Sequence, residues 1–363
     1  MTSKEIAKHR LISQQLAGTK LKSAVEMVHR LCAVQAQEYA QTKWGLGLRL
    51  PHLTDDDIEN DFTAGKIIRT HVLRPTWHFV SANDIKWLLT LTAPRVNAVN
   101  AYMYRQLELD ASVFNRCNDI LVRALQGNKQ LSRDTLNEAF RKNKIIAKGH
   151  RLSYIMMYAE LAGIVCSGAR QGNQFTYALL NERVRTTRSL DNDEALSELA
   201  TRYFMSRGPA TLKDFSTWSG LTLTDCRKAL EVTKLNFAKE VVEGDEYYFS
   251  SKISLNNKRL EGIYLLPIYD EFIMGYKNRS AVLEFKRSIK SRSLFHYDCM
   301  IVSDGQIIGT WKRTIAKNSI EIEFEFFRPA SKDQRKAFDN AIHHFEKFTN
   351  TAVTYDKKRT TTR

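Results

Sequence analysis

Two glutamines separated by one small residue form the part of this sequence best suited to chemistry. Gln35 and Gln37 flank Ala36 and follow the apolar run at 31–34. On extended backbone, side chains at alternating positions point to the same side, and each carboxamide offers a carbonyl acceptor and an NH2 donor. Such a pair can hold a water molecule without carrying charge, which suits hydrolysis of a bond whose leaving group is already good. The alternative is an ordinary polar start of a helix.

A dense group of charged and aromatic residues follows in the segment at 69–78. It contains Arg69, Arg74, Trp77 and His78. We expect members of this group to contact the phosphates or bases of a nucleic acid. The alternative is an ordinary β-strand, in which Trp77 is a core residue and His78 is a hydrogen-bonded polar one.

The charge balance favours a polyanionic partner. The chain has 55 Lys and Arg against 40 Asp and Glu, a formal net charge of +15 and a pI of about 9.5. Nucleic acid is the simplest such partner, although a basic housekeeping protein would show the same balance. With 363 residues, of which 43% are hydrophobic, the chain is expected to form about two to four packed units.

Cysteine usage and hydropathy exclude several other classes. The five cysteines are spread along the chain, with no Cys-x-x-Cys and no Cys/His cluster. We therefore expect no zinc or other metal site and no cofactor. The odd cysteine count and the lack of a recognisable signal peptide favour a reducing cytoplasm. No apolar stretch reaches the ~18 residues that a membrane span requires.

Three helices followed by a hairpin are clearest at 191–255. The first helix ends at Gly208-Pro209, and capping boxes at 211–214 and 222–225 begin two more helices. Between two apolar runs, the segment at 243–245 reads Glu-Gly-Asp and predicts a hairpin. This order, with a glycine turn before the third helix, is typical of a winged helix-turn-helix unit.

The same order of elements recurs more loosely in two earlier segments. In one, Ser132 caps a helix, and a basic spacer that includes Lys148 and Arg151 leads to the next helix. In the other, a helix capped by Ser23 ends at the glutamine pair. We predict an α+β fold of three tandem winged-helix units plus a C-terminal β-rich domain. The predicted boundaries are 1–110, 111–190 and 191–255 for the winged helices and 256–363 for the C-terminal domain.

The C-terminal segment contains several strand-like runs, a final helix at 332–348 and a basic tail at 357–359. Two groups of basic residues in it are candidates for contacts with a duplex backbone, which would make binding salt-sensitive and independent of sequence. They are Lys286, Arg287 and Lys290 in one group and Lys312 and Arg313 in the other. A solvated loop is the alternative for the first group.

Four stretches of the chain resemble the AlkZ-like DNA glycosylases, a family built from tandem winged helices. They are Gln35–Gln37, Arg74–His78, Leu266–Ser280 and Gly309–Thr314. The resemblance implies hydrolysis of the N-glycosidic bond of an alkylated purine in double-stranded DNA, leaving an abasic site. It also implies a bacterial protein of the cytoplasm that associates with the nucleoid, and we expect it to act as a monomer.

The implied reaction assigns roles to the candidate residues. Alkylation at N7 of guanine or N3 of adenine places positive charge on the base, so the leaving group needs no protonation by an enzyme acid. Gln35 and Gln37 would place water at C1′, and Asp270 would assist by stabilising an oxocarbenium-like sugar. The neighbouring Glu271 is expected to cap a turn or to pair with Arg279, which is itself a candidate DNA contact. No covalent lysine step is implied, so a monofunctional enzyme is expected.

An open basic surface formed by tandem winged helices would accept bulky adducts, including interstrand crosslinks. Two non-catalytic readings remain open at this point. A winged-helix transcription regulator would bind one operator sequence and release no base. A DNA-architectural protein or protein scaffold would do neither.

Overall fold

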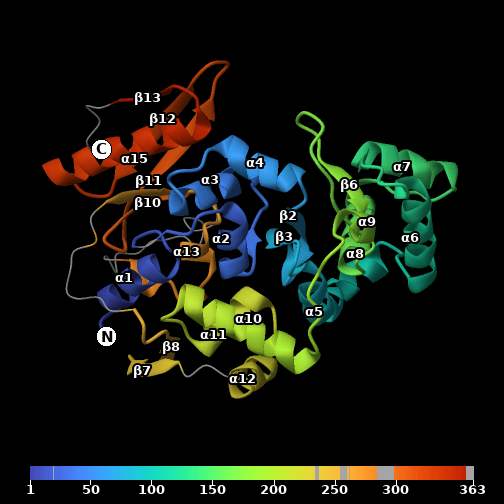
Figure 1. The fold of residues 1–363 in the computed structure, drawn as a ribbon, viewed down its shortest axis with the longest axis horizontal. Coiled ribbons are helices and arrows are strands. Elements are labelled where there is room, and N and C mark those ends of the chain that lie inside the picture. Colours follow the sequence, from blue (N-terminus) through green and yellow to red (C-terminus); the bar gives the residue numbers. More distant parts are fainter. Residues whose placement is uncertain (19, 234–236, 254–259, 261, 284–297, 357–363) are drawn as a thin grey trace.

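The computed structural model has the order of helices and strands expected for tandem winged helices followed by a sheet (Figure 1). It describes the chain except residues 19, 234–236, 254–259, 261, 284–297 and 357–363. The predicted α+β class is confirmed, since helices and antiparallel hairpins alternate before a C-terminal five-stranded sheet. The predicted basic tail at 357–359 lies outside the described residues.

The first unit holds the glutamine pair beside a three-stranded sheet of order β1-β3-β2. Capping boxes at Ser23, as predicted, and at Thr54 begin two of its helices. The short β1 is antiparallel to β3, with Gln35 opposite His78. The elements are α1 (Ser3–Ser13), α2 (Ala24–Leu31), β1 (Val34–Gln35), α3 (Tyr39–Arg49), α4 (Asp55–Thr63), β2 (Ile67–Val72) and β3 (Arg74–Ser81).

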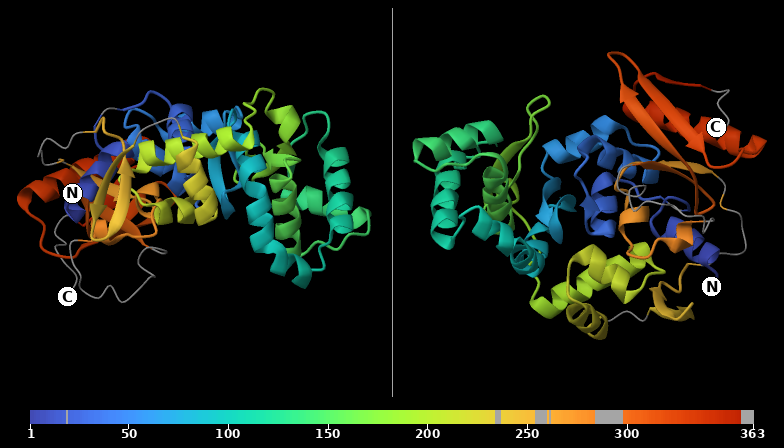
Figure 2. Two further views of the ribbon diagram at one scale, coloured as in Figure 1. Left: turned by 90° about the horizontal axis from the view of Figure 1, so that it is seen from below. Right: turned by 180° about the vertical axis from the view of Figure 1, so that it is seen from behind.

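The second unit has three main helices and a sheet of order β4-β6-β5. A long helix, α5 (Ile85–Gln106), leads into it. Ser132 caps the second of the three helices, as predicted. The elements are α6 (Ala111–Leu125), β4 (Leu131–Ser132), α7 (Arg133–Lys142), α8 (Gly149–Leu161), β5 (Val165–Ser167), β6 (Thr176–Leu179) and α9 (Leu180–Arg183). In the views of Figures 1 and 2 this unit lies at one end of the molecule.

The third unit matches its predicted pattern most closely. Both predicted capping boxes are formed, at Thr211 and Thr222, and Gly220 ends the helix between them. The elements are α10 (Asn192–Arg207), α11 (Leu212–Ser219), α12 (Leu223–Glu231), β7 (Ala238–Val242) and β8 (Asp245–Phe249). Gly220 has a left-handed backbone with φ of 73°, and a Cβ there would collide with the backbone of Leu73. A glycine therefore lets α11 approach the β2–β3 turn of the first unit.

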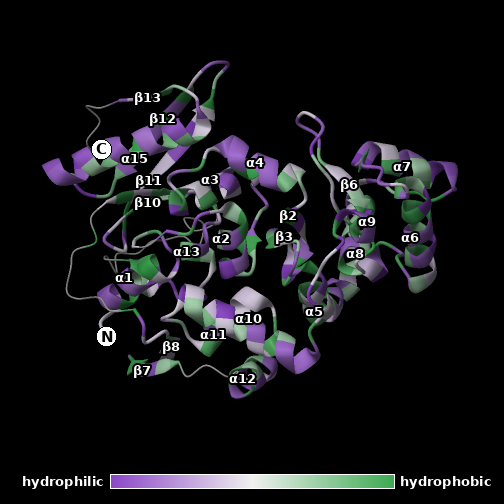
Figure 3. Ribbon diagram, in the orientation of Figure 1, coloured by the Kyte–Doolittle hydropathy of each residue, from purple (hydrophilic) through white to green (hydrophobic). Residues whose placement is uncertain are grey.

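The C-terminal segment forms a sheet of order β13-β12-β11-β10-β9, in which only the β12–β13 pair is parallel. The final helix is amphipathic and buries five of its residues (Phe338, Ala341, Ile342, Phe345 and Phe348). Figure 3 shows that many residues along the ribbon of this helix are hydrophilic. The elements are β9 (Ile263–Leu266), α13 (Glu271–Met274), the 3-10 helix η1 (Ser280–Val282), β10 (Cys299–Ser303), β11 (Gln306–Ile315), β12 (Ile320–Phe326), α15 (Lys332–Thr349) and β13 (Val353–Tyr355).

The hydrophobic cores do not follow the order of the chain. One core joins residues of the first unit to the C-terminal sheet and α15. Another joins the first unit to the third. The second unit has a core largely of its own, built from α6, α7, α8 and their strands. The first, third and C-terminal segments therefore form one larger body, beside which the second unit stands.

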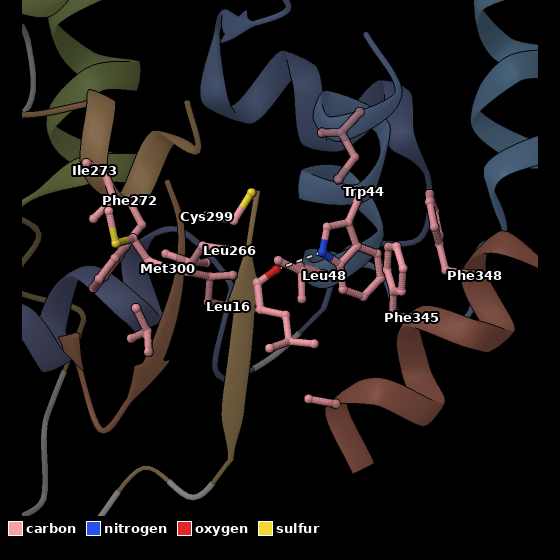
Figure 4. Close-up of a cluster of buried hydrophobic side chains, with 14 of the residues drawn as sticks. Leu16, Trp44, Leu48, Leu266, Phe272, Ile273, Cys299, Met300, Phe345 and Phe348 are labelled. Carbon is pink, nitrogen blue, oxygen red and sulfur yellow. Dashed lines mark hydrogen bonds between the residues drawn. The ribbon is translucent and has the colours of Figure 1, made fainter. Parts of the chain in front are cut away.

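Trp44 of α3 fastens the first unit to the C-terminal segment. Its indole is fully buried, donates a hydrogen bond of 2.7 Å to the carbonyl of Leu265, and contacts Phe345 and Phe348 of α15 (Figure 4). The side chain thus combines a large apolar contact with a satisfied polar group. This is the favourable situation for a buried tryptophan.

We predict that Trp44→Ala lowers the free energy of unfolding by about 3–5 kcal/mol, because it removes a large aromatic side chain from a filled core. Trp44→Phe should cost less, since it retains most of the packing and loses the hydrogen bond. Urea denaturation followed by circular dichroism measures both. Tyr102→Ala, at an exposed position on α5, is the control. An unchanged urea midpoint for Trp44→Ala would show that Trp44 does not stabilise the packing of the first unit on the C-terminal segment.

Candidate active site

The two glutamines of the motif contact each other through their side chains. Gln35 Nε2 donates a hydrogen bond of 2.6 Å to Gln37 Oε1. Gln35 is 5% exposed, whereas Gln37 is exposed to solvent. The amide of Gln37 is hydrogen-bonded to the buried Gln35 and is also exposed to solvent. Gln37 is therefore the member of the pair that can contact a ligand.

Arg74 fixes the orientation of this pair. Its Nη2 donates to Gln35 Oε1 at 3.2 Å, and its Nη1 donates to the carbonyls of Thr217 and Trp218 at the end of α11. A guanidinium can only donate hydrogen bonds. The oxygen of the Gln35 amide must therefore face Arg74, and its NH2 must face Gln37. The close approach that Gly220 permits brings the α11 carbonyls to Arg74.

His78 supports Arg74 as a neutral imidazole. It is fully buried, its Nδ1 lies 2.9 Å from the carbonyl of Thr76, and its Nε2 lies 3.4 Å from Arg74 Nη2. Burial, and then the positive charge of Arg74, hold the pKa of His78 well below its usual 6.5. The neutral ring donates through Nδ1 and accepts through Nε2. It is therefore a hydrogen-bond acceptor for Arg74.

Glu271 holds the backbone of the motif. Its Oε1 accepts a hydrogen bond of 2.9 Å from the backbone N–H of Gln35. Its Oε2 accepts from Arg207 at 2.6 and 3.1 Å and from Trp218 Nε1 at 3.0 Å. Glu271 is 1% exposed and Arg207 is 0% exposed. Each oxygen of this buried carboxylate is thus satisfied by donors from other segments.

Arg207 also reaches the motif directly. It donates to the carbonyls of Leu31 and Ala33 at 2.8 and 3.0 Å. The chain just before Gln35 is therefore held by the third unit on one side. The sequence alone indicates no role for Arg207 or Trp218, and for Glu271 we expected a turn cap or a pair with Arg279. No local pattern marks these contacts, because the partners lie far apart in the chain.

Asp270, for which we expected a catalytic role, pairs with Arg49. Its two oxygens accept hydrogen bonds of 2.8 and 2.9 Å from Arg49, and Oδ1 also accepts from the N–H of Phe272. The residue is 5% exposed and is the N-cap of α13. These are the contacts of a buried ion pair and a helix cap. The carboxylate next to the glutamine pair is Glu271.

Arg69 and Trp77 line the other side of the motif. Arg69 donates to the carbonyls of Ala36 at 2.8 Å and Gln37 at 3.4 Å. Its guanidinium lies 4.2 Å from the ring centre of Trp77 and 4.6 Å from that of Phe175. Burial lowers the pKa of Arg69. Of the residues expected to bind DNA, Arg69 and Arg74 thus hold the glutamine motif in place.

The remaining expected DNA contacts are spread over different units. Lys148 precedes α8, and Arg151 donates to the carbonyls of Leu107 and Glu108. Arg279 donates to the carbonyl of Ile273 at 3.0 Å. On β11, Lys312 is exposed and Arg313 is half-buried. Lys286, Arg287 and Lys290 lie outside the described residues.

The described part of the chain offers neither a cluster of metal ligands nor a membrane-spanning helix. Within it, no group of three or more His, Cys, Asp and Glu side chains is placed to hold a metal ion. No helix there is long and apolar enough to cross a membrane.

Comparisons with known proteins place the chain in a family. A family model described as "DNA glycosylase AlkZ-like" matches residues 28–348. A protein of Streptomyces sahachiroi named "Interstrand DNA cross-link repair glycosylase" is 22% identical over 310 residues, 80% of this chain and 82% of the relative. The solved structure of Streptomyces sahachiroi DNA glycosylase AlkZ matches with a TM-score of 0.80 and 20% identity. The match covers 98% of this chain and 100% of the chain of the solved structure.

The fold and the match to the family define an enzyme that acts on N-glycosyl bonds, a DNA glycosylase assembled from winged helices. Within that class, the chain belongs to the AlkZ-like DNA glycosylases. The resemblance inferred from its four sequence stretches is confirmed. Membership favours the enzyme over the non-catalytic regulator and the architectural protein.

The neutral state of His78 predicts a pH dependence of stability. Above pH 6.5 the imidazole is neutral in both the folded and the unfolded chain. Below pH 6.5 the unfolded chain takes up a proton that the folded protein does not, so stability falls with falling pH. Between pH 6.5 and 5.5 this loss should reach roughly 1 kcal/mol.

Urea unfolding of the wild type and of His78→Gln at pH 7.5 and 5.5 measures this effect. The wild type should lose more stability on acidification than the variant, because glutamine does not titrate. Other buried histidines contribute equally to both proteins and cancel in the comparison. Equal losses would show that His78 is protonated in the folded protein.

Proposed function

We propose that this protein hydrolyses the N-glycosidic bond of alkylated purines in duplex DNA, with the attacking water positioned by Gln35 and Gln37. N7-alkylguanine and N3-alkyladenine are the proposed lesions, since both leave without protonation by the enzyme. The observation that carries the proposal is the directly hydrogen-bonded glutamine pair, buried at Gln35 and exposed at Gln37. Membership of a DNA glycosylase family supports it.

The fixed direction of the hydrogen bonds defines what the pair offers to a water. Arg74 occupies Gln35 Oε1, and Gln35 Nε2 occupies one lone pair of Gln37 Oε1. The second lone pair of Gln37 Oε1 and the NH2 of Gln37 remain for a ligand. A water that donates to Gln37 Oε1 would direct its own lone pair at C1′ of the sugar. Gln37 is therefore the principal catalytic residue in this proposal, with Gln35 assisting.

The surroundings of the pair favour placement of water over its deprotonation. His78 is neutral, but its Nε2 faces Arg74 and is not directed to a substrate. Both oxygens of Glu271 are occupied by Gln35, Arg207 and Trp218. Glu271 is a positioning residue, because it acts on the reaction through the backbone of Gln35. Holding water and sugar in reactive geometry is itself a large part of a catalytic advantage.

A duplex is the proposed substrate, and the formal charge of +15 supports its electrostatic binding. The relative from Streptomyces sahachiroi is named for interstrand cross-link repair. We extend the proposal to bulky N7 adducts and crosslinks, which an open surface would admit. A monofunctional, metal-independent reaction is proposed because no lysine nucleophile or ligand cluster is required.

Excision of N7-methylguanine from a defined duplex tests the proposal. We expect abasic sites to form at full rate in excess EDTA, and strands to break only after alkali or heat. Borohydride should trap no protein on DNA. Loss of activity in EDTA, or a borohydride-trapped adduct, would overturn the mechanism.

Variants of the two glutamines test their separate roles. Gln37→Ala should lower single-turnover excision by roughly 10²-fold or more, the scale of losing a positioned polar group, while DNA affinity barely changes. Gln37→Glu should retain more activity than Gln35→Glu. The reason is that a carboxylate at 37 still accepts from Gln35, whereas one at 35 pairs with Arg74 and cannot donate to Gln37.

Gln106→Ala, at an exposed position at the end of α5, is the matched control for an amide removed elsewhere. Circular dichroism checks that each variant is folded. Wild-type excision by Gln37→Ala would refute the assignment. The reverse order of the two Glu variants would refute the direction of the hydrogen bonds.

A further inference from the structure

The wing of the second unit extends beyond its own core and packs on the first unit beside the glutamine motif. The N–H of Arg69 on β2 donates to Ser167 Oγ on β5 at 2.8 Å. Phe175, which precedes β6, lies against the guanidinium of Arg69 and 5.1 Å from the ring of Tyr39. Arg69 also donates to the carbonyl of Gln37. A single residue, Arg69, therefore contacts both the wing and the glutamine motif.

A second contact anchors the same wing. Arg170 forms an ion pair with Glu59 of α4 at 3.5 Å and lies over the rings of Tyr39 and Phe175. Both ends of the loop between β5 and β6 are therefore fastened to the first unit. The loop cannot move independently of the glutamine pair without breaking these contacts.

Between the anchors lies a tight turn at residues 171–174, here called the amide turn. The N–H of Gln171 donates to the carbonyl of Gln174 at 3.0 Å, and the reverse bond measures 3.1 Å. Gly172 has φ of 58° and open space around its Cβ position, so glycine is required by the backbone and not by packing. Arg170 Nη2 donates to Asn173 Oδ1 at 3.1 Å. The turn is thus held in one shape.

The amide turn exposes neutral hydrogen-bonding groups. All four residues are exposed, and three of them carry carboxamides (Gln171, Asn173 and Gln174). The wing of the third unit differs, because its turn carries Glu243 and Asp245. Acidic groups repel a phosphate backbone, whereas carboxamides both donate to and accept from base edges. Asn and Gln are also used to read the minor groove.

We propose that the amide turn inserts into a groove of duplex DNA and contacts the base edges of nucleotides flanking the damaged one. The inference rests on the proposed function of the glutamine pair, since it takes the damaged nucleotide to lie at Gln37. Strand residues advance ~3.3 Å each, so the turn begins a few ångströms beyond Phe175. Its rigid attachment to Arg69 sets the distance between the flanking contact and the catalytic pair.

Site-specific crosslinking tests the placement. All five native cysteines are buried, so a Gln171→Cys variant can be labelled selectively with a photoactivatable group. The probe is a duplex carrying a tetrahydrofuran abasic-site analogue, which the enzyme cannot cleave. We expect crosslinks to the nucleotides directly flanking the analogue. Asp245→Cys, labelled in the same way on the third wing, should give none there. Crosslinks from position 245 alone, or from 171 at random positions, would overturn the proposal.

Binding measurements test the chemistry. Gln171→Ala combined with Gln174→Ala should weaken binding to the analogue duplex roughly tenfold, the scale of two neutral hydrogen bonds. The slope of log affinity against log salt should stay at the wild-type value, because no phosphate charge is neutralised by an amide. Gln106→Ala should leave both quantities unchanged. Unchanged affinity of the double variant would refute the contact.

Base analogues separate base edges from phosphates. Inosine in place of a flanking guanine removes the minor-groove amino group, and 7-deazaguanine removes the major-groove N7 acceptor. One replacement should alter wild-type affinity and not that of the double variant. Insensitivity of the wild type to both would overturn base-edge contact. Because the analogue duplex requires no excision, these results stand apart from the N7-methylguanine assay, and either proposal can fail alone.

Discussion

The buried carboxylate of Glu271 is the group on which the assembly of the candidate site depends. Removing an ion from water costs several kcal/mol, and only well-placed partners offset that cost. Here Glu271 belongs to the C-terminal segment, and its partners come from two other units: Arg207 and Trp218 from the third and Gln35 from the first. These contacts link the backbone of the glutamine motif to the packing of all three segments.

A consequence of this arrangement is that the amide groups of the glutamine pair have a fixed orientation. Positive charge at Arg74 and Arg207 lies behind the motif, and all their hydrogen bonds point toward acceptors. The amide of Gln35 therefore has one favourable orientation, and through it so does the amide of Gln37. A neutral side chain is given a defined polarity without becoming charged. The reaction proposed above requires a fixed dipole of this kind, which does not have to rearrange as the reaction proceeds.

The three winged-helix units differ in how they contact the glutamine motif. The first unit carries the glutamines, and the third serves as their support through Arg207 and the end of α11. The second unit has its own core and meets the first through β5, the wing and α8. Glu160 of α8 contributes to this junction, since its carboxylate lies 2.7 Å from Nδ1 of His71 on β2. Units with the same order of elements thus make different contacts within the molecule.

Local signals in the sequence determined the elements and drew attention to the glutamine pair. The capping boxes at Ser23, Thr54, Thr211 and Thr222 each satisfy backbone donors within four residues, so they are legible without the fold. The two glutamines are recognisable because their spacing alone places them side by side. The family followed from short stretches of this kind.

The tertiary structure alone decided which residues support the pair. The hydrogen bond from Gln35 to Glu271 spans 236 residues, and that from Arg207 to Glu271 spans 64. Adjacent Asp270 and Glu271 look equivalent in sequence, yet one pairs with Arg49 and the other with the motif. The shared cores and the anchored wing are equally invisible along the chain. Burial and pairing are properties of surfaces brought together by folding, and no local spacing encodes them.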